Sequence, residues 1–88
     1  MATMTWRNDW ARRRFERLRS ALSGLGCTWI STTVVGPDNL MEWWGKSGQV
    51  LLVHVWDTGA WTVYGRVTDS NDTEQANRIQ SHLREEPP

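Results

Sequence analysis

The feature that most restricts the fold of this chain is a pair of predicted β-strands joined by a tight turn. Residues 50–56 (VLLVHVW) are apolar almost throughout, which indicates a strand at the centre of a sheet. Residues 60–68 (AWTVYGRVT) alternate between apolar and polar side chains, as a strand with one buried face does. The glycine of the intervening Asp57-Thr58-Gly59 supplies the positive φ that a three-residue hairpin loop requires. The sequence therefore predicts an antiparallel sheet.

Four further elements flank this hairpin. They are a helix, two strands and a second helix, at residues 5–23, 27–35, 40–44 and from about residue 70. The N-cap of the first helix is predicted to be Thr5 or Asn8. The order α-β-β-β-β-α predicts an α+β fold, with an antiparallel three- or four-stranded sheet flanked by an N-terminal and a C-terminal helix. A length of 88 residues allows one domain, residues 1–88.

The hairpin register decides which side chains face away from the helices. A three-residue loop gives the sheet one purely apolar face, made of Leu51, Val53, Val55, Trp61, Val63 and Val67. A two-residue Thr58-Gly59 loop would instead put Trp56 beside Trp61 and turn His54 into the core, because a slip of one residue exchanges the two faces. We favour the three-residue loop, which keeps His54 outside.

The opposite face then becomes the candidate binding surface. Met41 and Trp43 join it if Gly45–Gly48 forms a four-residue loop. The predicted partner-binding residues are Trp43, His54, Trp56, Tyr64 and Arg66. Tryptophan, tyrosine and arginine dominate the binding energy of protein interfaces, and a large exposed aromatic patch is unusual on a monomer. Three interpretations stay open: these side chains complete a small core, are buried in a homodimer, or contact a foreign partner.

Seven tryptophans account for most of the aromatic residues of the chain. Five of them are predicted to lie in or near the core: Trp6, Trp10, Trp29, Trp44 and Trp61. The N-terminal helix also places Arg14 and Arg17 beside Trp10, where a guanidinium group can stack on the indole.

Charge is distributed unevenly although the formal net charge is zero. Residues 1–25 hold six arginines and two acids, a net charge of +4, and the remaining residues carry −4. Arg12, Arg13 and Arg19 fall on the solvent side of the predicted helix, where they could steer a partner or contact phosphate groups. Nucleic-acid binding through this helix is therefore an alternative function, although an isoelectric point of about 6.7 is low for such a module.

Catalytic motifs receive little support. Asp57-Thr58-Gly59-Ala60 resembles the active-site signature of retroviral-type aspartic proteases, in which two subunits each supply one aspartate. The 28 residues that follow Ala60 leave no room for the other conserved parts of that family, and a hairpin turn also explains the motif. Cys27 is the single cysteine, and His54 and His82 lie outside any metal-ligand spacing. We expect no enzyme activity, no metal and no cofactor.

Targeting signals are not evident in the sequence. No stretch approaches the roughly 20 apolar residues that span a bilayer. The first seven residues lack the apolar run of a signal peptide. We therefore expect a soluble cytoplasmic protein with no membrane partner.

The sequence resembles short proteins of phages and other mobile elements in two runs, VWDTGAWTVY at residues 55–64 and TDSNDT at residues 68–73. This class includes anti-CRISPR proteins. The resemblance implies a non-enzymatic inhibitor in the host cytoplasm, which occludes a functional surface of a host protein or ribonucleoprotein complex. It transfers no functional residue, because the class has no common catalytic motif.

Overall fold

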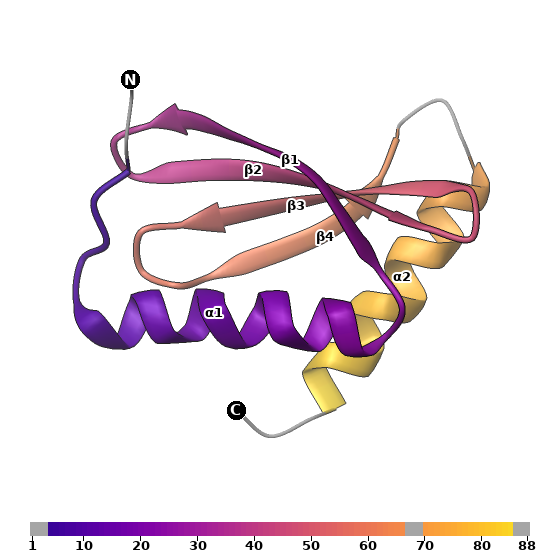
Figure 1. Ribbon diagram of the computed structural model, residues 1–88, viewed down its shortest axis with the longest axis horizontal. Coiled ribbons are helices and arrows are strands. Elements are labelled where there is room, and N and C mark those ends of the chain that lie inside the picture. Colours follow the sequence, from indigo (N-terminus) through magenta and orange to yellow (C-terminus); the bar gives the residue numbers. More distant parts are fainter. Residues whose placement is uncertain (1–3, 67–69, 86–88) are drawn as a thin grey trace.

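The computed structural model describes residues 4–66 and 70–85 and contains one four-stranded antiparallel sheet with two helices (Figure 1). The strands lie in the order β1-β2-β3-β4. The elements are α1 (Asp9–Gly24), β1 (Thr28–Gly36), β2 (Asn39–Lys46), β3 (Gln49–Trp56), β4 (Trp61–Gly65) and α2 (Ser70–Glu85). The predicted α+β fold with the order α-β-β-β-β-α is confirmed.

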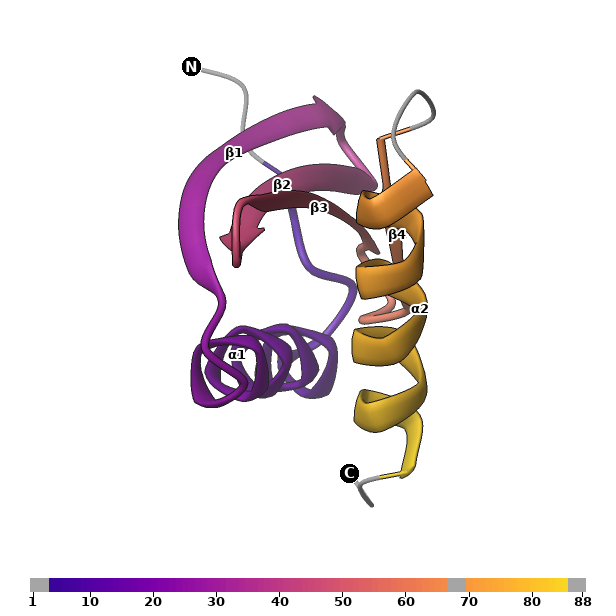
Figure 2. The ribbon, with the colours of Figure 1, turned by 90° about the vertical axis from the view of Figure 1, so that its right-hand side faces the viewer.

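Both helices pack on the same face of the sheet. The centre of that face is formed by Leu51, Val53 and Val55 of β3, which have no exposed surface. The helices contribute buried side chains to the same cluster, namely Leu18, Leu22, Ala76, Ile79 and Leu83. Figure 2 shows α1 beneath the curved sheet and α2 standing along its β4 side. The other face of the sheet is therefore left without a covering helix.

The β3–β4 hairpin has the three-residue loop predicted from the sequence. The N–H of Trp56 donates to the carbonyl of Ala60 at 2.9 Å, and Val55 pairs with Trp61. Gly59 adopts the expected positive φ of 87°. A Cβ on Gly59 would also lie 3.2 Å from the Cα of Ala11, so the loop packs directly against α1. This register leaves His54 on the face without helices.

The β2–β3 hairpin corrects the predicted four-residue loop. Lys46 pairs with Gln49, so the loop contains two residues, Ser47 and Gly48. Their φ values of 51° and 81° are those of a type I′ turn, whose twist matches that of the flanking strands. The observed register differs from the predicted one by two residues. Because side chains alternate with a period of two, Trp43 still faces away from the helices, as predicted.

Helix α1 starts at Asp9, which confirms Asn8 as the cap over the alternative Thr5: the Asn8 side chain accepts a hydrogen bond from the Ala11 N–H at 2.8 Å. Ala11 is fully buried under the β3–β4 hairpin, and Trp10 is 59% exposed. The predicted core position of Trp10 is therefore wrong: the small alanine allows the hairpin to approach, which turns Trp10 outward. Arg14 lies 4.8 Å from the Trp10 ring centroid, as the sequence predicted.

The other four tryptophans predicted to lie in or near the core differ in their burial. Trp44 is buried, and Trp6 and Trp61 are partly buried against the core cluster. Trp29 is 47% exposed because it lies on β1, at the edge of the sheet. Neither of the described helices is long and apolar enough to cross a membrane.

Candidate binding surface

The face of the sheet opposite the helices carries six large side chains from the three strands β2, β3 and β4. We call this surface the open aromatic face: Met41, Trp43, Leu52, His54, Trp56 and Tyr64. All six side chains are half-buried, in contrast to the fully buried residues that alternate with them on β3. The sequence-predicted residues Trp43, His54, Trp56 and Tyr64 therefore lie together on one surface.

Cross-strand pairing arranges the open aromatic face in rows. Trp43 of β2 pairs with Leu52 of β3, which in turn pairs with Tyr64 of β4. In the next row Met41 pairs with His54. Neighbouring pairs across antiparallel strands bring side chains into direct contact. The face is thus a continuous apolar and aromatic surface across three strands.

Specific contacts hold these side chains in place. The rings of His54 and Trp56 stack with their centroids 4.1 Å apart. The Tyr64 hydroxyl donates to the Met41 sulfur at 3.4 Å, and His54 Nε2 lies 3.0 Å from Asn39 Oδ1. Side chains already ordered by such contacts lose little conformational entropy when a partner binds. The geometry therefore favours a preformed recognition surface.

The guanidinium group of Arg66 is already engaged within the chain, and its contact with a partner stays a prediction. Strand β4 ends at Gly65, and Arg66 forms an ion pair with Asp72, a fully buried residue in the first turn of α2. The hydrogen bond from Arg66 lowers the pKa of the Asp72 carboxyl; donation from the Val50 N–H acts in the same direction, and burial opposes it. Arg66 therefore holds α2 against the sheet.

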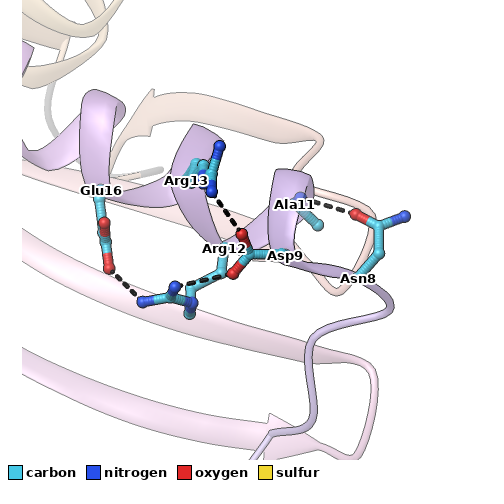
Figure 3. Close-up of polar contacts among 6 residues, drawn as sticks. All are labelled: Asn8, Asp9, Ala11, Arg12, Arg13 and Glu16. Carbon is cyan, nitrogen blue, oxygen red and sulfur yellow. Dashed lines mark hydrogen bonds and ion pairs between the residues drawn. The ribbon is translucent and has the colours of Figure 1, made fainter.

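The arginines predicted to steer a partner are engaged within the chain. Figure 3 shows Arg12 between Asp9 and Glu16, at 2.7 and 3.0 Å, and Arg13 on the second oxygen of Asp9 at 2.9 Å. The hydrogen bond from Arg12 lowers the pKa of the Asp9 carboxyl. These pairs reduce the positive potential on this side of α1, although exposed pairs of this kind stabilise by only about 0–1 kcal/mol each.

The third of these arginines points toward the sheet. Arg19 Nε lies 3.5 Å from Glu42 Oε1, and its guanidinium carbon lies 5.4 Å from the Phe15 ring centroid. The prediction that Arg19 lies on the solvent side of the helix is therefore only partly confirmed. Nucleic-acid binding stays a prediction, and it loses support because phosphate groups would have to compete with carboxylates already in place.

Glu42 is a buried carboxylate that the sequence did not single out. It is 1% exposed and accepts from Thr32 Oγ1 at 2.5 Å and Trp44 Nε1 at 3.2 Å, in addition to the ion pair with Arg19. Because side chains alternate along β2, position 42 lies on the inner face, opposite to Trp43. A shallow groove of about 590 Å³ lies beside it, lined by Glu16, Arg19, Ser20, Ser23, Trp29 and Trp44. Because both oxygens are already bonded, Glu42 has a structural role here.

The remaining reactive groups also have structural positions. Asp57 opens the β3–β4 loop, its N–H donates to the Asp38 carbonyl at 2.8 Å, and its carboxylate lies 3.8 Å from Arg7. The turn thus accounts for the Asp-Thr-Gly motif, and the protease alternative stays a prediction. Burial raises the pKa of the Cys27 thiol, which disfavours the nucleophilic thiolate. No group of three potential metal-ligating side chains gathers within the part of the chain that the structure describes.

Comparison with family models, curated proteins and solved structures found no match to this chain. Function is therefore inferred from the geometry of the surface. The open aromatic face combines large apolar side chains, ordered polar groups and the absence of a covering helix.

Proposed function

We propose that this chain is a non-enzymatic protein-binding module that recognises its partner through the open aromatic face. The observation that carries the proposal is the placement of both helices on one side of the sheet, which leaves the aromatic side uncovered (Figure 2). Contiguous apolar patches of this kind mark interaction sites on soluble proteins.

The chemistry of the face supports a protein partner. Trp43, Trp56 and Tyr64 are large, rigid side chains of the kind that anchor protein interfaces, and they are half-buried before any partner binds. Ser31, Thr33 and Thr62 lie beside them on neighbouring strands and supply a polar rim. An apolar centre with a polar rim fits a folded protein surface of matching polarity.

The mode of action we favour is steric. A module of 88 residues that binds flat against a larger assembly can block one functional surface of that assembly. This is the way in which the resemblance to mobile-element inhibitors would apply, with a host protein or ribonucleoprotein complex as the target. The basic N-terminal segment and the acidic remainder would then orient the partner before contact.

The test compares substitutions inside and outside the open aromatic face. A partner is first identified by co-purification from cells of the source organism, and its affinity for each variant is then measured. Trp43→Ser and Trp56→Ser should each weaken binding by about 30-fold or more, the effect of removing an interface anchor. Trp10→Ser is the matched control, because Trp10 is exposed on α1. Full affinity of both face variants would refute the proposal, as would their unfolding, because these residues would then belong to the core.

A further inference from the structure

Strand β1 has the most exposed apolar side chains of the described chain. Four large hydrophobic side chains are exposed in the described residues, and three of them belong to β1: Trp29 at 47%, Ile30 at 51% and Val35 at 59%. β1 is also an edge strand, with β2 as its one neighbour in the sheet. This edge adjoins the open aromatic face, whose polar rim includes Ser31 and Thr33 of β1. The outward main-chain groups of the edge have no role in the function proposed above.

The two edges of the sheet differ in whether another element covers them. At the β4 edge, α2 lies alongside the strand, and Gln80 Oε1 accepts the hydrogen bond of the Val63 N–H at 2.9 Å. At the β1 edge, no helix, loop or side chain in residues 4–66 and 70–84 bonds to the outward N–H and C=O groups of the strand. Figure 2 shows β1 arching along the side of the sheet away from α2. These unpaired main-chain groups fit one kind of occupant, another extended strand.

The composition of β1 does not protect this edge. Natural edge strands usually carry charges or proline, which block pairing with another chain. β1 (TWISTTVVG) has neither, and six of its nine residues are β-branched. Its pairing with β2 is irregular at two places, between Trp29 and Ser31 and between Val34 and Gly36. The stretch between them, residues 31–34, pairs regularly with β2.

We propose that β1 pairs with β1 of a second copy of this chain, antiparallel across a two-fold axis near Thr32 and Thr33. Self-pairing places each strand opposite its own sequence, so any charge on β1 would meet like charges; β1 has none. Its β-branched side chains form favourable cross-strand pairs. A strand of another protein would find no charged residue on β1 that could select it.

The dimer would contain one continuous eight-stranded sheet. A two-fold axis perpendicular to the sheet keeps both open aromatic faces on the same side. The recognition surface would thus be present twice, and a partner with two sites would bind with higher avidity.

Molar mass in solution tests the dimer. Sedimentation equilibrium of the wild-type chain should give twice the 10.2 kDa of one chain. The double variant Ile30→Lys/Val35→Lys should give the monomer mass with an unchanged circular dichroism spectrum, because both side chains are exposed. Trp10→Lys, which puts a lysine at the exposed apolar residue outside β1, should stay dimeric.

Cross-linking tests the antiparallel geometry independently of the lysine variants. In a Cys27→Ala background, a short bis-maleimide should link two Thr33→Cys chains, because the two-fold axis brings these positions together. It should not link Thr28→Cys chains, whose thiols would be roughly 30 Å apart in antiparallel strands.

Three results would overturn the proposal. They are a wild-type monomer up to millimolar concentration, equal cross-linking at both cysteine positions, and a dimer that survives the two lysines. Loss of such a surviving dimer in Trp56→Ser would assign self-association to the open aromatic face. Partner capture by the monomeric lysine variant would leave the proposed function intact, so the two proposals can fail separately.

Discussion

Glu42 is the residue whose burial most needs an explanation, because a carboxylate in a core is costly unless it is bonded. Its partners come from three places: Thr32 of β1, Trp44 of β2 and Arg19 of α1. We expect Glu42→Ala to lower the free energy of unfolding by about 1–3 kcal/mol, because it leaves the buried Trp44 indole N–H without an acceptor. The Arg19 side chain is 43% exposed, so water can replace the lost carboxylate there. Urea unfolding followed by circular dichroism measures this loss.

The conservative variant separates charge from hydrogen bonding. Glu42→Gln should cost less than Glu42→Ala, since its amide oxygen still accepts a hydrogen bond. Glu74→Ala is the control on the exposed face of α2 and should change stability by no more than about 0.5 kcal/mol. A Glu42→Ala variant as stable as this control would show that the bonds to Glu42 contribute nothing.

Alternation along a strand is enough to give the direction of Glu42, but it cannot give the partners of its carboxylate. The period of two along β2 places position 42 on the inner face. Arg19 and Thr32 reach it through the packing of α1 and the pairing of β1, which are long-range contacts. For the same reason the ion pair between Arg66 and Asp72 was not predicted. The sequence identifies a charged residue, but tertiary packing determines which opposite charge lies beside it.

Helix α2 packs on β4 through a glycine, and this contact gives a prediction about elements. A Cβ on Gly65 would overlap the backbone of Asp72 and Thr73. The strain would fall on the helix backbone, which cannot move as a flexible side chain can. We expect Gly65→Ala to destabilise the fold by about 1–3 kcal/mol, or more if α2 detaches. The midpoint of thermal unfolding measures the effect.

Gly24→Ala is the matched control for this contact. Gly24 is the last residue of α1, and a Cβ there would have no atom within 4 Å. Alanine favours a helix more than glycine does, so this variant should be neutral or slightly more stable. Equal stability of the two variants would mean that α2 does not press on the backbone of β4.

Element order was predictable because each element has a strong local signal. The β-branched run of β1, the apolar run of β3 and the Asp-Thr-Gly turn each specify local structure. Loop length between β2 and β3 was not predictable from Gly45–Gly48, since two glycines allow more than one turn. The sides of Met41 and Trp43 were nevertheless correct, because both loops preserve the alternation.

At the scale of the whole molecule, the open aromatic face was predictable and the exposed edge was not. One face of β3 is purely apolar, so both helices had to cover that face. Which edge they leave bare depends on where α2 lies, and local sequence does not fix this. Trp29 was assigned to the core because indoles are usually buried, yet it lies on an edge strand, where it lines the shallow groove beside α1 and stays 47% exposed.

Acid should destabilise the whole fold through Asp72, which joins α2 to the sheet by accepting from Arg66 and from the Val50 N–H. These bonds lower the pKa of Asp72 in the folded chain. A carboxyl with a lowered folded-state pKa stabilises the protein above its unfolded-state pKa, and this stability is lost as the pH falls through the folded-state pKa. We therefore expect the urea midpoint of the wild type to decrease as the pH is lowered from neutral to acidic.

Asp72→Asn should be less stable at neutral pH and should lose part of this pH dependence, because its amide can still accept from Val50 but carries no titrating charge. Glu74→Gln, on the exposed side of the same helix, should keep the wild-type slope. An Asp72→Asn variant with the full wild-type pH dependence would assign acid sensitivity to other carboxyls and leave α2 held by its apolar contacts alone.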